Sequence, residues 1–318
     1  DIIGESPAAQ ALRAQIERIA NLAGSAATDA PTVLICGETG TGKDLAARYL
    51  HQCSRRASRP FVHVDCAALP KDLIEAELFG HVKGAFTSAL GERTGLIEAA
   101  EDGVVFLDEI GELPLELQTK LLAVLERRTL RRVGSSQERR TQAWFVAATN
   151  RDVEKMVAEG ALRSDLYYRL NVLPLTLPPL RDRGDDAVLI AEHCARQVAR
   201  RYGLAPASFT ADAKARLRHY AWPGNIRELR HLVERALLLA GGGPLDAASL
   251  LLPGDVAATP ARSPLDALAG LTLDAAEKLL IEHALSETGN NVSEAARKLG
   301  VTRMTMRYRM KQHGIEPG

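Results

Sequence analysis

The sequence predicts an α/β domain on a mainly parallel sheet, then an all-α subdomain, and finally a small all-α domain. Apolar strand-like runs recur at PTVLICG, PFVHVDC, GVVFLDE and AWFVAATN, with helical segments such as residues 115–128 between them. Alternating strands and helices are typical of a parallel sheet. After the last of these strands the hydrophobic pattern is mainly helical, which indicates the all-α parts.

The elements follow in order from hydrophobic spacing. Residues 8–23 repeat apolar positions at helical spacing, and PTVLICG then runs into a glycine-rich turn. Residues 241–270 are rich in Gly, Ala and Pro with few periodic positions, so we expect a linker there. Helical patterns cover residues 185–202, 210–220 and 225–240 before the linker, and 273–288, 292–299 and 303–313 after it. The expected limits are 1–178 for the α/β subdomain, 179–241 for the helical subdomain, 242–270 for the linker and 271–318 for the last domain.

Length and composition narrow the class of protein. A chain of 318 residues is enough for about two domains, and 46% hydrophobic with 25% charged residues is typical of a soluble globular protein. No apolar run approaches the roughly 20 residues that span a bilayer, and no signal peptide is visible, so we expect a cytoplasmic protein without a membrane partner. The cysteines form no Cys-x-x-Cys pair, which indicates neither a zinc site nor a disulfide framework. The chain begins at Asp1, not Met, as a fragment would.

The C-terminal end combines helix-turn-helix spacing with a local basic charge. The formal net charge of the chain is +0, but six Lys and Arg stand against two Glu from Gly289 to Gly318, and GVT separates the last two helical patterns. A recognition helix reads base edges from its N-terminal part and holds phosphates with Arg and Lys, so we expect binding to double-stranded DNA. The alternative is an amphipathic helix with a solvated basic face. The candidate contacts are Thr302, Arg303, Thr305, Arg307, Tyr308, Arg309 and Lys311, with Ala295, Ala296 and Leu299 facing the core and Gly300 at the turn.

GETGTGKD follows a strand and opens a helix, which is the context of a phosphate-binding P-loop. Its glycines let backbone amides close around phosphates, and the helix N-terminus adds positive potential. Lys43 would reach the β and γ oxygens, whereas Asp44 stands where the general pattern has a Ser or Thr for magnesium. The candidate nucleotide contacts are Gly37, Glu38, Thr39, Gly40, Thr41, Gly42, Lys43 and Asp44.

Polar residues that suit phosphoryl transfer follow other strands. VVFLDE ends in Asp108, which would hold Mg²⁺, and Glu109, which would orient the attacking water. FVAATN ends in Asn150, whose amide would sense the γ-phosphate. Arg163 and Arg169 flank an apolar face, and an arginine from a neighbouring subunit accelerates phosphoryl transfer by roughly 10³ to 10⁵. The alternative for each is an ordinary solvated side chain.

Six motifs stand in the order found in the bacterial enhancer-binding proteins, the NtrC-like AAA+ activators of sigma-54 RNA polymerase. They are GETGTGKD, ELFGHVKGAFTSA, VVFLDEIGELP, AATNRD, LRSDLYYRLNVLPLTLPPLRDR and WPGNIRELRHLVERA. The chain resembles this family from Ile2 to about Ala240 as a AAA+ ATPase and from Leu273 to Ile315 as a Fis-type helix-turn-helix domain. The resemblance implies a P-loop ATPase with a helical lid, ATP and Mg²⁺ as cofactors, and a missing N-terminal regulatory domain.

The resemblance also implies roles by position. An acid is usual after the P-loop lysine in this family, so Asp44 is expected there. The motifs imply Walker A at Gly37 to Asp44, Walker B at Asp108 and Glu109, sensor I at Asn150, arginine fingers at Arg163 and Arg169, sensor II at Arg227, and an adenine contact at Ile3. Because the fingers act across a subunit interface, we expect a homo-oligomeric ring, typically a hexamer, and a dimer when inactive.

Two positions depart from the family pattern. Asp65 stands where the family usually has an Asn that restrains the catalytic Glu, and a carboxylate donates no hydrogen bond unless protonated. The stretch GHVKGAFTSAL matches no phosphate or metal pattern, but it holds the family's sigma-54 loop, here Gly84, Ala85, Phe86, Thr87, Ser88 and Ala89. Ser88 replaces a Gly, which costs on the order of 1 kcal/mol if the backbone there is left-handed. An exposed Phe86 would suit a partner contact, and the alternative is a Phe tucked into the core.

These implications predict a transcription activator that binds an upstream activating sequence, assembles a ring and hydrolyses ATP to remodel sigma-54 RNA polymerase holoenzyme. One alternative is an ATP-binding, DNA-binding regulator that does not engage sigma-54. Another is a different AAA+ remodeller with a DNA anchor, which would leave the Phe86-Thr87 loop unexplained.

Overall fold

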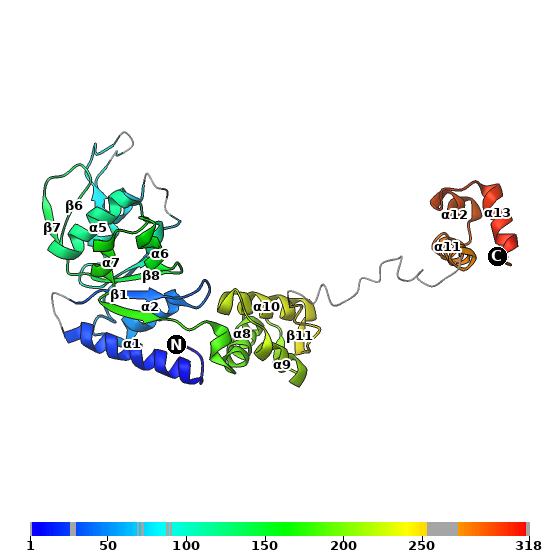
Figure 1. Cartoon of the computed structure of the whole chain (residues 1–318), viewed down its shortest axis with the longest axis horizontal. Coiled ribbons are helices and arrows are strands. Elements are labelled where there is room, and N and C mark those ends of the chain that lie inside the picture. The colour runs from blue at the N-terminus through cyan, green and yellow to red at the C-terminus, as the bar shows by residue number, and fades with distance from the viewer. Residues whose placement is uncertain are drawn as a thin grey trace. The chain divides into compact units, whose positions relative to one another are not determined.

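The computed structural model describes residues 2–25, 30–68, 70, 73–86, 89, 91–252 and 273–315. The chain divides into two compact units, Asp1–Leu251 and Leu252–Gly318 (Figure 1). The first holds a parallel sheet with helices on both faces and a helical lid, and the second is helical. The expected fold class is therefore confirmed. None of the described helices has the length and apolar character needed to cross a membrane.

The central sheet has five strands in the order β2-β5-β8-β1-β9, and every neighbouring pair is parallel. Its apolar strands are buried on both faces, since all six residues of β8 are buried. The edge strand β9 was not predicted, because Pro174 interrupts its pattern, and an edge is where a strand tolerates proline. The bounds are β1 (Val33–Cys36), β2 (Phe61–Asp65), β5 (Val104–Asp108), β8 (Trp144–Thr149) and β9 (Leu173–Thr176).

Two apolar cores cover the two faces of this sheet. Side chains of α1 (Pro7–Ser25) and α2 (Lys43–Cys53) pack on one face, and those of α5 (Leu115–Arg127) and α7 (Ser164–Leu170) pack on the other (Figure 1). The sheet is thus held rigidly, which fixes the loops at the ends of its strands. The shorter elements are α3 (Ile74–Phe79), β3 (Gly80–His81), β4 (Arg93–Thr94), α4 (Leu96–Ala99), η1 (Ile110–Glu112), β6 (Thr129–Arg131), β7 (Glu138–Arg140), α6 (Val153–Ala158) and η2 (Leu180–Arg183).

The lid consists of α8 (Asp186–Tyr202), α9 (Ala211–His219) and α10 (Asn225–Ala240). Two short parallel strands, β10 (Ala205–Phe209) and β11 (Gly242–Leu245), pair beside these helices. The segment expected to be linker therefore begins with a strand, and the buried side chains of Leu245, Leu250 and Leu252 hold its first part against the lid.

The C-terminal unit has three helices: α11 (Leu273–Glu287), α12 (Val292–Lys298) and α13 (Arg303–Gln312). Ala295 and Ala296 lie in its core, as expected, and Leu299 packs against them. The side chains of Asn291 and Thr302 accept hydrogen bonds from the first turns of α12 and α13. These N-caps satisfy backbone amides that a helix leaves free, and so they fix where the two helices begin.

Candidate nucleotide-binding site

The P-loop connects β1 to α2 at the carboxyl edge of the sheet. Gly40 and Gly42 have positive φ values of 81° and 97°, which glycine adopts without strain. A Cβ atom on Gly40 would lie 2.3 Å from the carbonyl oxygen of Gly224, so the lid backbone approaches the loop closely. The amides at the start of α2 are thus presented beside the lid, where they can bind an anion.

Lys43 is nearly buried within this loop. Its Nζ donates a hydrogen bond to the carbonyl oxygen of Gly37 at 3.1 Å and lies 3.8 Å from Oε1 of Glu109. The ammonium group is therefore held inside the loop with one carboxylate nearby, in the position that a phosphate-binding lysine requires.

Three strand ends bring the expected catalytic residues together. Asp108 ends β5, and its Oδ1 accepts a hydrogen bond from the amide of Glu109, which has a left-handed φ of 51°. Asn150 follows β8 and donates its backbone amide to Oε2 of Glu109 at 3.3 Å. Its side-chain amide donates to Oγ1 of Thr39 at 2.8 Å. Asn150 therefore connects the P-loop to Glu109, which is the placement expected of a γ-phosphate sensor.

The carboxylates beside the P-loop lysine suit Mg²⁺. Oδ1 of Asp44 is buried and has no hydrogen-bond partner among the described residues. His63 lies between it and Asp108, with ring nitrogens 3.8 Å and 3.6 Å from the two carboxylates. The described residues contain no group of three or more His, Cys, Asp or Glu side chains arranged around a metal. Magnesium needs only one or two carboxylates when phosphates and water complete its shell, so the residues fit this ion.

The lid closes the cleft from the other side. A cavity of about 480 Å³ lies between the P-loop, Asp108 and Glu109 on one wall and α10 on the other. Arg227 lines this cavity, as expected for sensor II, and its backbone amide donates to the carbonyl oxygen of Gly40. Arg230 lines it too and was not predicted, although its position one helical turn after Arg227 places both on one face of the helix.

A smaller apolar pocket adjoins the P-loop. Ile3, the expected adenine contact, lines it together with Ile190 and Ile226 of the lid. An apolar pocket beside a phosphate-binding loop is suited to the base of a nucleotide. The other lining residues are Ile2, Leu12, Thr41, Gly42, Leu45, Ala46, Leu177 and Arg183.

Glu38 ties the P-loop to the start of the lid. Arg181 donates to both carboxylate oxygens of Glu38, at 2.9 Å and 2.6 Å, and the side-chain amide of Asn225 donates to Oε2. The hydrogen bonds from Arg181 and then Asn225 lower the pKa of Glu38 to about 2. Asn225 is fully buried, and its Oδ1 accepts from the amide of Leu180. Sequence reasoning placed Glu38 in the loop but missed Arg181 and Asn225.

Arg163 and Arg169 lie on or beside α7, and neither lines the cavity of its own chain. The guanidinium of Arg163 is exposed and forms two hydrogen bonds with Asp165. That of Arg169 donates to the carbonyl oxygen of Leu125, and its Nε has no partner among the described residues. The two expected fingers are thus brought near each other but not to the P-loop of the same chain.

Asp65 lies opposite Asp108 in the register of β2 and β5. Its exposed carboxylate accepts hydrogen bonds from the amides of Ala67 and Ala68 at 2.9 Å and 3.1 Å. In this arrangement the carboxylate caps the turn after β2. The expected link to Glu109 stays a prediction.

The expected sigma-54 loop rises between β3 and β4. Phe86 is half-buried, and its ring meets the edge of the His81 ring with centroids 5.0 Å apart. Gly84 has a φ of 80° and donates its amide to the carbonyl oxygen of Ala89. Thr87 and Ser88 lie outside the described residues. Phe86 therefore packs against the stem of its own loop rather than within a domain core.

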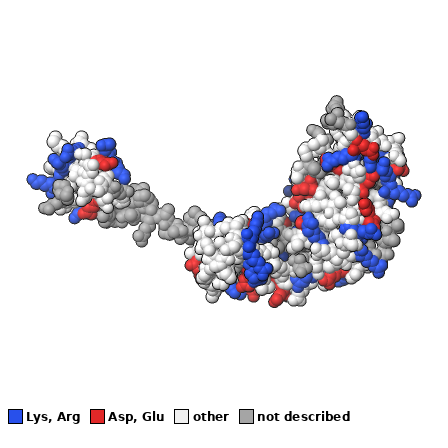
Figure 2. Space-filling view, turned by 180° about the vertical axis from the view of Figure 1, so that it is seen from behind, with Lys and Arg blue, Asp and Glu red and all other residues white. Residues whose placement is uncertain are grey.

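The candidate DNA-binding face lies on α13. Arg303, Thr305, Arg307, Tyr308 and Lys311 are exposed, and Figure 2 shows Lys and Arg side chains around the surface of this unit. Two expected contacts have internal partners instead. Thr302 caps the helix, and Arg309 pairs with Glu277 of α11 at 3.0 Å. Met304, which was not predicted, is 83% exposed on the same helix.

Three family profiles match the chain in sequence order. The "Sigma-54 interaction domain" matches residues 2–176, the "AAA+ ATPase lid domain" matches 181–263, and "Bacterial regulatory protein, Fis family" matches 272–313. The boundaries follow the α/β subdomain, the lid and the C-terminal helices described above.

Curated bacterial regulators are similar to nearly the whole chain. It is 45% identical over 322 residues to "Nitric oxide reductase transcription regulator NorR2" of Cupriavidus necator, covering 95% of this chain and 60% of NorR2. It is 46% identical over 305 residues to "Transcriptional regulatory protein ZraR" of Salmonella typhi, covering 96% of this chain and 67% of ZraR. The chain therefore spans about two thirds or less of these two relatives.

A solved structure shares the arrangement. The crystal structure of NtrX from Brucella abortus in complex with ADP superposes with a TM-score of 0.72 at 32% sequence identity. The match covers 99% of this chain and 70% of that one. A relative with the same fold thus binds an adenine nucleotide.

Proposed function

Because the chain belongs to the sigma-54 interaction domain family, with an AAA+ lid and a Fis-family domain, we propose that it is an ATP-driven activator of sigma-54 RNA polymerase. It would bind DNA upstream of a promoter, assemble into a ring and remodel the holoenzyme into the open complex. The observation that carries the proposal is the grouping of Lys43, Glu109 and Asn150 around a P-loop that faces a lid arginine.

Each group at the cleft has a defined task in hydrolysis. The amides at the start of α2 and the Lys43 ammonium bind the phosphates, and Arg227 adds a second cation from the lid. Glu109 holds and polarises the attacking water, while Asn150 keeps the Glu109 carboxylate beside the P-loop. Asp108 would hold Mg²⁺, which neutralises charge on the phosphates when it is bound.

A second copy of the chain would complete this site. The chain's own cleft lacks Arg163 and Arg169 among its lining residues. Tyr168, between them on α7, is 74% exposed, which is unusual for a large aromatic side chain without a partner. A ring with heterologous interfaces would place this surface against the P-loop of the next copy.

The loop at Phe86 would transmit the result of hydrolysis to sigma-54. A half-buried aromatic ring on a narrow stem can be released from His81 and presented to a partner at small cost. The C-terminal helices would hold the ring near the promoter, with Arg303 and Arg307 of α13 facing the DNA.

Open-complex formation on a sigma-54 promoter tests the proposal. Permanganate footprinting should detect melted DNA with holoenzyme, this chain and ATP, but not when a non-hydrolysable analogue replaces ATP. Phe86→Ala should abolish melting and leave the ATPase rate within about twofold, because a surface loop residue away from the cleft does not change the chemistry. Melting without ATP, or with Phe86→Ala, would show that the chain is not this kind of activator.

A further inference from the structure

The N-terminal segment at residues 2–6 forms one wall of the apolar pocket, and the lid forms another. Ile2 and Ile3 line the pocket from the segment, while Ile190 and Ile226 line it from α8 and α10. The phosphate-binding loop belongs to neither wall, because it is fixed to the sheet. How the segment is attached therefore decides whether the base of a nucleotide is held by the sheet or by the lid.

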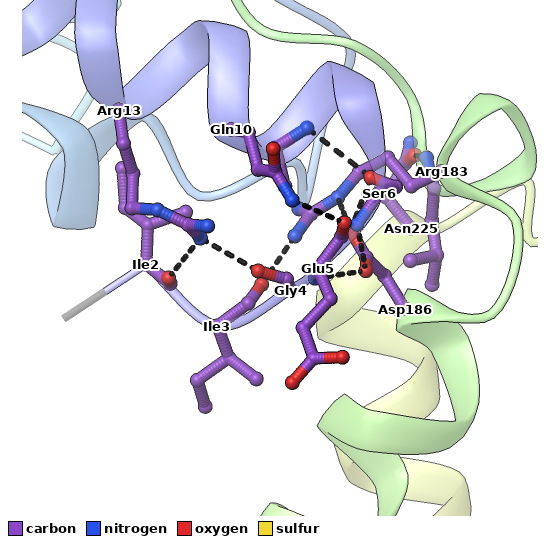
Figure 3. A network of polar contacts seen from close by, with 12 residues as sticks. Ile2, Ile3, Gly4, Glu5, Ser6, Gln10, Arg13, Arg183, Asp186 and Asn225 are labelled. Carbon is purple, nitrogen blue, oxygen red and sulfur yellow. Dashed lines mark hydrogen bonds and ion pairs between the residues drawn. The ribbon is translucent and has the colours of Figure 1, made fainter.

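A buried carboxylate of the lid holds this segment. Asp186 is the first residue of α8 and is 1% exposed. Its Oδ1 accepts hydrogen bonds from the amides of Glu5 and Ser6 at 2.7 Å and 3.0 Å, and its Oδ2 accepts from the hydroxyl of Ser6 at 2.7 Å (Figure 3). The segment is thus bonded to the lid through backbone and side chain alike.

Arg183 completes the attachment. Its Nε donates to Oδ2 of Asp186 at 3.0 Å, and its terminal nitrogen donates to the carbonyl oxygen of Ile3 at 2.5 Å (Figure 3). Arg13 of α1 donates to the carbonyl oxygens of Ile2 and Gly4 from the other side. Arg183 therefore grips the carbonyl group of the residue whose side chain lines the pocket.

The fit at Gly4 shows that the contact is close. Its φ is +144°, and a Cβ atom there would lie 2.3 Å from Oδ2 of Asp186. Any larger residue would push the segment away from the carboxylate.

Asp186 is a charged group at this site. Burial tends to raise its pKa, but the hydrogen bonds from Ser6, Glu5 and Arg183 outweigh burial and lower the pKa below its ordinary value. A buried carboxylate with this many donors is strongly held, and removing one of its donors or its charge leaves buried polar groups unpaired.

We propose that Asp186 is a positioning residue that makes the adenine-side segment part of the lid. This inference rests on the proposed ATP site. The lid and the segment would hold the adenine as one body, while the P-loop and the sheet hold the phosphates. A change in the phosphates would then shift the lid through the nucleotide itself, and a shift of the lid would change the affinity for the adenosine part.

Equilibrium binding of two probes tests the proposal on the full chain. Fluorescent ADP contacts both bodies, whereas inorganic tripolyphosphate, used as a competitor, contacts only the phosphate side. Asp186→Asn should weaken ADP binding about tenfold, because an amide replaces a charged acceptor of several hydrogen bonds, and should leave tripolyphosphate affinity within twofold. Asp185→Asn is the matched control, since Asp185 is exposed and pairs with Arg218 at 2.5 Å outside the segment. It should change neither affinity.

Two further variants keep the test valid if Asp186→Asn fails to fold. Ser6→Ala removes the hydroxyl donor to Asp186 and the cap of the Ala9 amide, whereas Ser6→Thr keeps a hydroxyl. Ser6→Ala should weaken ADP binding about threefold or more, and Ser6→Thr should restore it. Equal losses for both probes, or wild-type ADP affinity in Asp186→Asn and Ser6→Ala, would overturn the inference alone. A wild-type chain that binds neither probe would overturn the nucleotide site and the inference together.

Discussion

The nucleotide cleft and the arginine pair of α7 lie in the same unit but differ in what surrounds their charged groups. At the cleft, Lys43, Glu109 and Asn150 contact one another or the P-loop. Arg163 instead pairs with Asp165 two residues away, and Arg169 donates to a backbone carbonyl group of α5. One copy thus supplies the groups that bind phosphates and orient water, while its arginines are held ready on another surface. The difference indicates a site shared between copies.

Replacing an arginine of α7 should give the largest effect. Arg163→Ala should lower the ATPase rate by about 10³-fold or more, because the transferring phosphoryl group loses a cation that no residue of the same cleft replaces. Binding of fluorescent ADP should change little. Arg59→Ala, which removes another exposed arginine paired with an aspartate, serves as control and should keep the wild-type rate. A normal rate for Arg163→Ala would mean that one chain carries its whole site.

Removing the water-orienting acid should be nearly as severe. Glu109→Gln should lower the ATPase rate by about 10²- to 10⁴-fold, since an amide cannot accept the proton of the attacking water. ADP affinity should stay near the wild-type value in the same titration. Glu112→Gln provides a matched control, because this acid lies one turn away and pairs with Arg151 at the surface. Comparable losses in both variants would remove Glu109 from its assigned role.

The tie at Glu38 should have a smaller effect, on binding. Glu38→Gln keeps the shape of the side chain but loses the charge that Arg181 grips with two hydrogen bonds, so ATP affinity should fall by about threefold to tenfold. A loss confined to the maximum rate, with unchanged affinity, would contradict this role.

The same carboxylate predicts a pH dependence of stability. Its pKa is lowered from 4.5 to about 2, so its contribution to stability is present above pH 4.5 and is lost as the pH falls toward 2. Melting temperatures of the wild-type chain should therefore fall slightly more steeply with acidity than those of Glu38→Gln. The difference should be small because the pair is exposed. Parallel curves for the two chains would show that the tie adds nothing to stability.

The sequence was sufficient for residues that stand at the ends of predicted strands. Lys43, Asp108, Glu109 and Asn150 follow β1, β5 and β8, and the carboxyl ends of parallel strands meet at one edge of the sheet. Their grouping could thus be predicted from the order of the elements alone. Arg227 followed from its motif, and Arg230 could have been found from helical spacing.

Residues that link the lid to the sheet could not be found in this way. Asn225 bonds Glu38 across 187 positions of sequence, and Asp186 bonds Ser6 across 180. Such contacts depend on how the lid packs, which no local pattern encodes. Short elements were missed for a related reason, since β3, β4, β6 and β7 have two or three residues each and too little periodicity to detect.

Mixing two inactive chains tests the shared site most directly. Lys43→Ala lacks phosphate binding but keeps Arg163, whereas Arg163→Ala keeps the P-loop but lacks the arginine. Each chain alone should be inactive. Their equimolar mixture should recover up to about a quarter of the wild-type ATPase rate, because random assembly through heterologous interfaces makes one interface in four complete. A mixture that stays as inactive as its components under conditions where wild-type chains assemble would contradict the account.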